Sequence, residues 1–237
     1  MPYGNGWRQT ADIFPVEVGR KVPVFVFIHG GWWYFLDKKD HSFVAKPFRE
    51  RDCVCVCVTY PLAPMVTIGG IVESVRQSLA WVYKNIERFG GDPDRIHIAG
   101  HSAGGHLTAM MMVTDWAAYG APRDLVKSGC AISGLFDLGE LLNVPQNANF
   151  RMLPDVVEAN SPIKLIPKAA SPFVVCVGRN ETPGFLRQHD AFVKAWASDS
   201  RPLVDASMDG ENHFGIIEQL SNPESPLFQA TIQNVLG

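Results

Sequence analysis

The sequence predicts an α/β fold in which a mostly parallel sheet is flanked by helices. Short apolar runs alternate with segments whose apolar residues recur at helical spacing. The runs are continuous and rich in Val, Ile and Cys, as in strands that are buried on both faces. The predicted strands are Val22–Ile28, Cys53–Thr59, Arg95–Ala99, Lys127–Ile132, Phe173–Val177 and Leu203–Met208. The predicted helices are Ile68–Phe89, Gly104–Tyr119, Gly184–Ser198 and Pro226–Leu236.

The cysteines fit this sheet. Cys53, Cys55 and Cys57 alternate along one predicted strand, so their side chains should share one face. The five cysteines are an odd number, and none lies in a C-x-x-C pair. We therefore expect buried structural thiols, with no disulfide framework and no metal site.

One stretch departs from the strand–helix rhythm. Residues 134–171 contain six prolines or glycines and no long apolar run, and they separate two predicted strands. We expect an excursion over the edge of the sheet, which would act as a minimal cap. With no repeat and no long linker elsewhere, the sequence predicts a single domain spanning residues 1–237.

Composition narrows the range of partners. Hydrophobic residues make up 46% and charged residues 19%, which is typical of a globular protein. A formal net charge of −3 gives no electrostatic footprint for nucleic acid or an acidic membrane. No apolar run reaches the roughly 18 residues of a membrane span, and the N-terminus has no secretory pattern. We expect a cytoplasmic protein with a small-molecule substrate and no cofactor, and leave homodimer formation open.

The sharpest motif is Gly100-His101-Ser102-Ala103-Gly104. It fits G-x-S-x-G and lies between a predicted strand and a predicted helix, where a nucleophilic serine sits on a sharp, strained turn. Small neighbours allow the strand and the helix to approach each other. The helix N-terminus favours negative charge that develops near the serine. The alternative is an ordinary turn in which Ser102 caps the helix.

A serine hydroxyl needs a base, and His213 is the best candidate. It follows the last predicted strand, where hydrolases with this motif order place the base. Three other histidines lie too close to Ser102 in sequence or interrupt regular elements: His41, His97 and His106. His189 lies within a predicted helix and should be a surface or capping residue.

The orienting acid is predicted to be Glu181, in the loop that follows Phe173–Val177. Asp137, which follows the preceding strand, is the main competitor. Asp205 and Asp209 are weaker candidates, since each could be a solvated or turn-forming carboxylate.

A second motif, His29-Gly30-Gly31-Trp32-Trp33, follows strand Val22–Ile28. Glycines allow backbone N–H groups to approach an oxyanion closely. We expect the amides of Gly30, Gly31 and Ala103 to form an oxyanion hole, with His29 supporting the loop. The aromatic residues beside it are expected to line the substrate site, although loop packing is the alternative. They are Trp32, Trp33, Tyr34 and Phe35.

With these motifs in place, the sequence resembles the α/β-hydrolases, and among them the kynurenine formamidase (arylformamidase) branch. The resemblance spans nearly the whole chain and includes Ile132-Ser133-Gly134-Leu135-Phe136-Asp137-Leu138, Ala159-Asn160-Ser161-Pro162 and His213-Phe214-Gly215-Ile216-Ile217-Glu218. It implies hydrolysis of N-formylkynurenine to kynurenine and formate, or of simple esters. Ser102 and His213 match the family's nucleophile and base, and Glu181 stands where that branch usually has aspartate.

Two classes of function follow from these residues. The first is a serine hydrolase that cleaves a small formamide or a short-chain ester through an acyl-enzyme, either as an arylformamidase or as a general carboxylesterase. The second is a non-catalytic protein that binds a small hydrophobic ligand in the same fold. The presence of a serine, a base and the oxyanion glycines favours the hydrolase.

Overall fold

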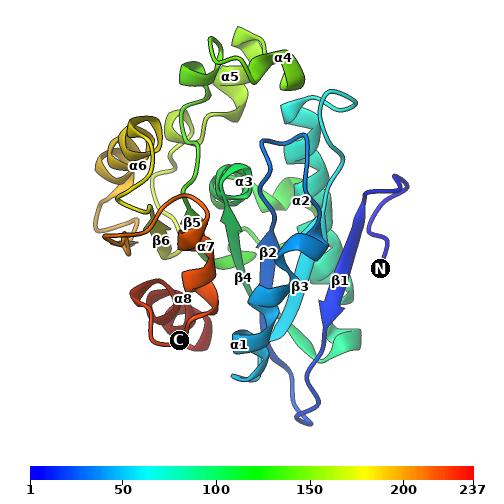
Figure 1. The fold of residues 1–237 in the computed structure, drawn as a ribbon. Coiled ribbons are helices and arrows are strands. Elements are labelled where there is room, and N and C mark those ends of the chain that lie inside the picture. The colour runs from blue at the N-terminus through cyan, green and yellow to red at the C-terminus, as the bar shows by residue number, and fades with distance from the viewer.

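A seven-stranded sheet forms the centre of the protein, whose computed structural model describes residues 1–237 (Figure 1). The strands are β1 (Thr10–Phe14), β2 (Val22–Ile28), β3 (Val54–Thr59), β4 (Gly91–His101), β5 (Val126–Ile132), β6 (Phe173–Cys176) and β7 (Leu203–Asp205). Their spatial order is β1-β3-β2-β4-β5-β6-β7. β1 is antiparallel to β3, and all other neighbours are parallel, which confirms the predicted fold class.

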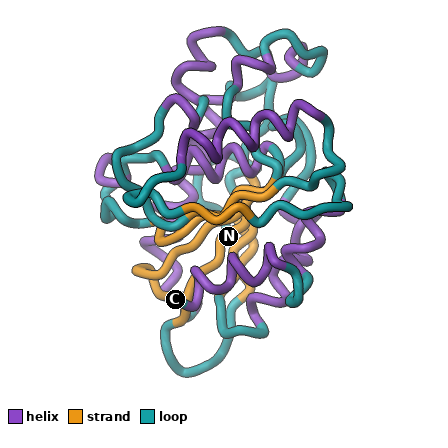
Figure 2. The backbone as a smooth tube through the Cα atoms, turned by 90° about the vertical axis from the view of Figure 1, so that its left-hand side faces the viewer, coloured by secondary structure: helices purple, strands orange, loops and turns teal.

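Helices cover both faces of this sheet (Figure 2). They are α1 (Ala45–Arg49), α2 (Ile68–Asn85), α3 (Ala103–Met112), α4 (Asn147–Phe150), α5 (Pro154–Asn160), α6 (Pro183–Trp196), α7 (Gly215–Glu218) and α8 (Pro226–Leu236). Strand β2 shows how the layers form, because all seven of its residues are buried. Val24, Val26 and Ile28 share a core cluster with α2 and α3, whereas Phe25 and Phe27 pack with α1 and α8.

The side chains of β3 and of Cys53, which directly precedes it, alternate between the two faces in the same way. Cys53, Cys55 and Cys57 lie in the core cluster that contains Phe25 and Phe27, and no cysteine in the chain is disulfide-bonded. Burial raises the pKa of the Cys53 and Cys57 thiols to about 12, so both are protonated at neutral pH. The prediction of buried structural thiols is confirmed.

Several element boundaries differ from the prediction. β1 was missed because only Ala11 of its five residues is fully buried, as befits a short edge strand. The helix predicted to reach Tyr119 ends at Met112, and a 3₁₀ turn (Trp116–Tyr119) follows after the Asp115 carboxylate caps the amide of Ala117. β4 is longer than predicted and β7 is shorter.

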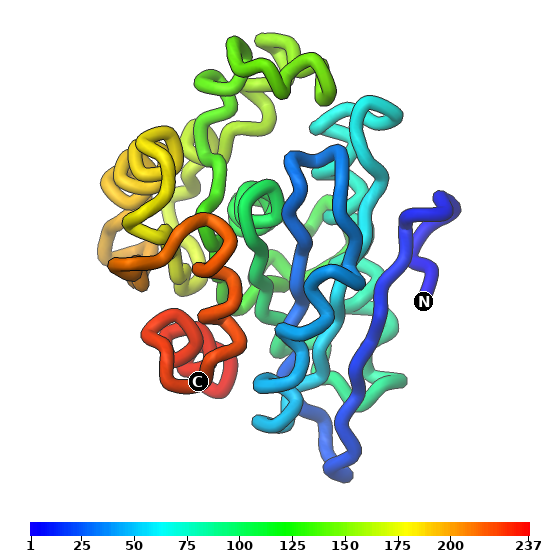
Figure 3. The backbone as a smooth tube through the Cα atoms, in the orientation of Figure 1, coloured from blue at the N-terminus to red at the C-terminus, as the bar shows by residue number.

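The excursion at 134–171 lies over the carboxyl edge of the sheet and not beside one of its outer strands. β5 and β6 are neighbours, so the chain leaves the sheet and returns between adjacent central strands. Figure 3 follows this path from β5 over the carboxyl ends of the strands and back to β6. The excursion holds α4, α5 and the 3₁₀ turns Leu138–Leu141 and Pro162–Lys164.

The excursion is tied to α6 by one amide side chain. Gln188 Oε1 accepts the backbone N–H groups of Phe136 and Asp137 at 2.8 and 2.7 Å, and its Nε2 donates to the Asp137 carbonyl. The start of the excursion is thereby fixed above the carboxyl edge of the sheet. No helix in the chain has the length and apolar character that crossing a bilayer requires.

Candidate active site

Ser102 sits on a sharp turn between β4 and α3. Its backbone has φ +58° and ψ −119°, a conformation that side chains rarely adopt and that stores strain. Glycines make the turn feasible: a Cβ on Gly104 would lie 2.0 Å from the Ile28 carbonyl oxygen, and one on Gly100 would lie 2.3 Å from that of Gly104. The Ser102 amide donates to the Ile132 carbonyl at 2.8 Å, which ties the turn to β5.

Three loops at the carboxyl edge bring a serine, a histidine and a glutamate together. The Ser102 hydroxyl lies 3.1 Å from His213 Nε2, and His213 Nδ1 donates to Glu181 Oε2 at 2.6 Å. Ser102 is 4% exposed, and Glu181 is 8% exposed. A histidine so placed can accept the serine proton while the carboxylate stabilises the resulting imidazolium.

The Glu181 carboxylate is held on its other oxygen as well. Oε1 accepts a hydrogen bond from the Ser133 hydroxyl and another from the Gly178 amide at 3.0 Å. Ser133 is buried and has φ +50°, so the chain adopts an unfavourable conformation at the end of β5 to deliver this hydroxyl. These bonds fix the carboxylate that faces His213.

The loop that carries His213 is fixed by a second histidine. His101 Nε2 donates to the His213 carbonyl at 2.8 Å, and the two rings lie 4.7 Å apart. Burial, together with the nearby His213, keeps the pKa of His101 well below its ordinary value. His101 is therefore neutral, and it positions the loop without adding a charge beside the base.

The competing carboxylates lie elsewhere. Asp137 Oδ1 accepts the Gly139 amide at 2.9 Å and caps the turn Leu138–Leu141. Asp205 bonds Ser207 and lies 3.1 Å from His189; burial opposes ionisation, but these contacts outweigh it and keep the pKa of Asp205 below its ordinary value. Asp209 is exposed. His189 is only 2% exposed, so its expected surface position is wrong.

The candidate oxyanion donors lie beside Ser102. The amides of Gly30 and Gly31 make no hydrogen bond within the protein, and Ala103 is the first residue of α3, whose N–H has no partner inside the helix. Gly30 is close to the nucleophile, because a Cβ there would lie 3.2 Å from Ser102 Cβ and 2.7 Å from the His101 carbonyl oxygen. His29 Nδ1 donates to the Gly30 carbonyl at 2.7 Å.

The four aromatic residues after Gly31 do not share one wall. Trp33 is fully buried, and its indole N–H donates to His106 Nδ1 at 3.2 Å, so it packs beneath the loop. Phe35 is 42% exposed, and Tyr34 packs against it. Trp32 lines a cavity, and its ring also stacks on Phe150 of α4 with centroids 6.2 Å apart.

That cavity, of about 280 Å³, lies between the excursion and the start of α6. Its lining includes Trp32, Leu135, Leu141 and Phe185. The Phe185 ring is 4.2 Å from the ring of His213, which places the cavity next to the candidate base. No sequence pattern singled out Phe185; only the start of a helix directly after the Glu181 loop could have indicated it.

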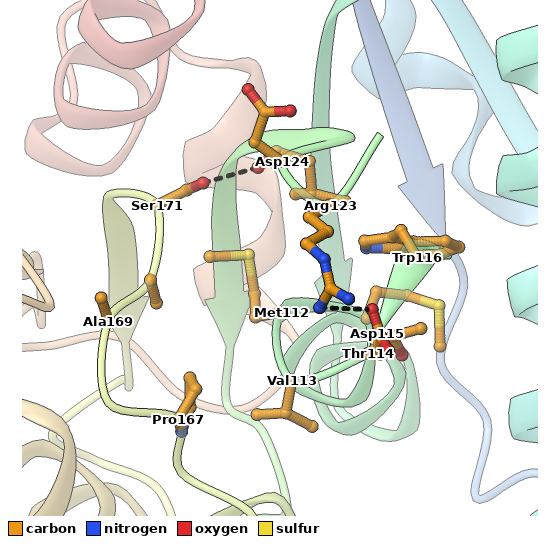
Figure 4. A pocket seen from close by; sticks show the side chains of 13 residues that line it. Met112, Val113, Thr114, Asp115, Trp116, Arg123, Asp124, Pro167, Ala169 and Ser171 are labelled. Carbon is orange, nitrogen blue, oxygen red and sulfur yellow. Dashed lines mark hydrogen bonds and ion pairs between the residues drawn. The ribbon is translucent and has the colours of Figure 1, made fainter. Parts of the chain in front are cut away.

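A larger hollow of about 640 Å³ lies at the other end of α3 (Figure 4). It contains Met112, Trp116 and an ion pair between Arg123 and Asp115 at 3.3 Å. Since a helix rises about 1.5 Å per residue, Met112 lies about 14 Å from Ala103 along the axis. Neither this hollow nor the cavity of about 280 Å³ is lined by Ser102, His213 or Glu181, but the smaller cavity adjoins His213 through Phe185.

Comparison with known proteins places the chain among hydrolases of this fold. The BD-FAE family model matches residues 12–134. Kynurenine formamidase from Salmo salar is 32% identical over 240 residues, covering 98% of this chain and 80% of the relative. Esterase LipQ from Mycobacterium tuberculosis is 30% identical over 202 residues, covering 76% of this chain and 48% of the relative.

A solved structure agrees with these sequence matches. A candidate thioesterase from Silicibacter sp. superimposes with a TM-score of 0.82 at 34% identity, covering 98% of this chain and 84% of that one. The agreement over the full chain extends the relationship beyond the motifs around Ser102 to the excursion and the His213 loop.

Proposed function

We propose that this chain, which belongs to the BD-FAE family and to the kynurenine formamidase branch of the α/β-hydrolases, is a serine hydrolase with Ser102, His213 and Glu181 as its catalytic triad. The observation that carries the proposal is the hydrogen-bonded series from Ser102 Oγ through His213 to Glu181, at 3.1 and 2.6 Å. The single domain consists of residues 1–237, with 134–171 as a minimal cap.

The reaction proceeds through an acyl-enzyme. Ser102 Oγ attacks the carbonyl carbon of a formamide or ester, and His213 Nε2 accepts the hydroxyl proton. The amides of Gly30, Gly31 and Ala103 stabilise the tetrahedral oxyanion. The bond to the leaving amine or alcohol then breaks as His213 returns the proton. Water, activated by His213, hydrolyses the acyl-enzyme and releases formate or a short carboxylic acid.

The substrate we propose is N-formylkynurenine or a related aryl formamide, which would place the protein in tryptophan catabolism. The kynurenine formamidase relative supports this choice, and the cavity of about 280 Å³ suits an aryl leaving group. Trp32 forms part of its wall. We place the protein in the cytoplasm.

A general short-chain carboxylesterase is the second candidate. The esterase relative and the same triad geometry favour it. Its acyl-enzyme chemistry is the same, and the acyl group and the leaving group differ.

One experiment tests both proposals. Purified protein is assayed on N-formylkynurenine and on p-nitrophenyl acetate, butyrate and octanoate. We expect the highest kcat/KM for the formamide or the acetate, and a decline of about 10-fold or more by octanoate, because each unaccommodated methylene costs about 1–3 kcal/mol. A maximum at octanoate contradicts the small-acyl proposal. A maximum at acetate without formamide turnover favours the carboxylesterase.

A fluorophosphonate label tests the mechanism itself, because only an activated serine reacts. We expect labelling of the wild-type chain and none of Ser102→Ala. Absence of labelling in the wild type, with intact folding, would instead support a protein that binds a ligand without turnover.

A further inference from the structure

The cavity beside His213 carries one cation and one anion. Arg187 enters it from α6 and Glu140 from the turn Leu138–Leu141 of the excursion, with Nη2 and Oε2 3.4 Å apart. Five of the lining residues are hydrophobic: Trp32, Leu135, Leu141, Val144 and Phe185. Two opposite charges from two different elements thus meet in a mainly apolar pocket.

This ion pair is available to a ligand. The side chains of Arg187 and Glu140 are 65% and 42% exposed, and neither makes another side-chain hydrogen bond. Arg179, by comparison, faces both Asp190 and Asp205. An exposed pair at this distance contributes little to stability, so a ligand can replace each partner at small cost.

The position of His213 indicates which part of the substrate occupies the cavity. The group that protonates the leaving atom must be within hydrogen-bond reach of it, so the leaving group lies on the His213 side of Ser102. Phe185 both packs against His213 and lines the cavity. A leaving group that continues from His213 past Phe185 would reach Arg187 and Glu140.

We infer that Arg187 and Glu140 determine specificity for a leaving group that carries an α-amino acid headgroup; the inference rests on the proposed hydrolase function. The planar guanidinium of Arg187 binds the carboxylate, and Glu140 accepts the ammonium. A headgroup with one charge would satisfy one side chain and leave the other without a partner. A neutral headgroup would use neither, and only a zwitterion matches both.

Four 2-formamidophenyl ketones that differ in the group carried beyond the ketone test this inference. N-formylkynurenine carries both charges, N-formylkynuramine the ammonium alone, 4-(2-formamidophenyl)-4-oxobutanoate the carboxylate alone, and 2-formamidoacetophenone neither. We expect the wild-type kcat/KM to be about 10- to 100-fold higher for the zwitterion than for the uncharged substrate, mainly through KM. Equal values across the four would overturn the inference.

Two variants assign the charges. Arg187→Met should lower kcat/KM about 10-fold for the two substrates that carry a carboxylate, and Glu140→Gln should do so for the two that carry an ammonium. Neither should change turnover of 2-formamidoacetophenone. Arg123→Met is the matched control, because it removes an exposed ion pair of 3.3 Å in the distant hollow. Equal losses on all four substrates would mean that the pair only holds the excursion, which contradicts the inference.

A product-inhibition assay separates failure of this inference from failure of the proposed function. Hydrolysis of p-nitrophenyl acetate is inhibited with kynurenine or with 2-aminoacetophenone, so formamide turnover is not needed. Tighter inhibition by kynurenine that is lost in Arg187→Met supports the site, even if the protein is a carboxylesterase. Equal inhibition by both compounds overturns it. Activity that survives in Ser102→Ala refutes the proposed mechanism. The inhibition by kynurenine then still decides whether Arg187 binds the headgroup.

Discussion

The turn at Ser102 and the excursion at 134–171 meet at the same edge of the sheet but are built differently. Residues 100–111 are all buried, and the space beside Gly104 is closed by the Ile28 carbonyl oxygen. The excursion consists of short helical turns, and its charged residues Glu140 and Glu158 pair with Arg187 and Lys164 through exposed contacts.

This difference separates two tasks. Groups that react must be held to within about 0.5 Å, which requires close packing and hydrogen-bonded support. Groups that select a leaving group need only present shape and charge, which short turns at the surface can provide. We therefore expect substitutions at the packed edge to abolish turnover, and substitutions in the excursion to change substrate preference.

The largest expected effect comes from the acid at the packed edge. Glu181→Gln keeps the shape of the side chain but cannot stabilise an imidazolium at His213, so kcat should fall about 10³- to 10⁴-fold. Asp137→Asn is the matched control in the excursion, where the carboxylate caps a 3₁₀ turn. Its kcat should stay within a few fold of wild type. The reverse outcome in an ester assay would move the acid to the Asp137 loop.

Glycine substitutions sharpen the contrast in packing. In Gly104→Ala the new Cβ would lie 2.0 Å from the Ile28 carbonyl oxygen, a backbone atom that cannot move away alone. We expect a loss of about 3 kcal/mol or more in the free energy of unfolding, measured in urea. Gly69→Ala in α2 is the control, since its Cβ would meet only Asn160 at 3.6 Å. It should gain about 0.5–1 kcal/mol through helix propensity. Equal stabilities would show that the turn can relax.

The sequence predicted the parts of the site that depend on local order along the chain. The G-x-S-x-G turn, the Gly30–Gly31 loop and the loops of Glu181 and His213 each come after a strand, and parallel strands bring their carboxyl ends to one edge. The apolar runs therefore sufficed to predict which loops would meet.

Contacts between distant segments could not be predicted in this way. The hydroxyl of Ser133 reaches Glu181 only because β5 and β6 are neighbours, and strand order is not encoded in any single run. Trp33 was expected at the substrate and is buried instead, where it contacts His106 and Phe150 from distant segments. The place of the excursion, between the neighbouring strands β5 and β6, depends on strand order in the same way.

Substitution of one buried serine at the packed edge and one in the excursion should have smaller effects. Ser133→Ala removes the hydroxyl that holds Glu181, so kcat on an ester should fall about 10- to 100-fold with KM little changed. Ser161 accepts the Leu138 amide at 3.0 Å inside the excursion. Ser161→Ala should lower the free energy of unfolding by about 1–2 kcal/mol, with kcat on the same ester nearly unchanged. A similar loss of kcat in both variants would argue that the two regions act as one unit.

The last expected effect is an acid sensitivity of the sheet and its adjoining loops, since the excursion contains no histidine. Burial lowers the pKa of His97 and His106 to about 4 and that of His29 to about 3, whereas an unfolded histidine titrates near 6.5. Between pH 6.5 and 4 the unfolded chain binds protons that the folded chain does not. Stability is therefore complete above pH 6.5 and declines as the pH falls towards 4.

Each such histidine contributes about 1.4 kcal/mol per pH unit to this decline where its two states differ fully in protonation. His97 is the residue of choice for the measurement, because its Nδ1 contacts Ser128 at 2.8 Å and it lies outside the proposed triad. The free energy of unfolding is measured in urea at pH 7, 6 and 5. It should fall less steeply with decreasing pH in His97→Gln than in wild type, by the slope that one bound proton contributes. Equal slopes would mean that His97 gains its proton without unfolding, so that the sheet at this point is less tightly closed than the turn at Ser102.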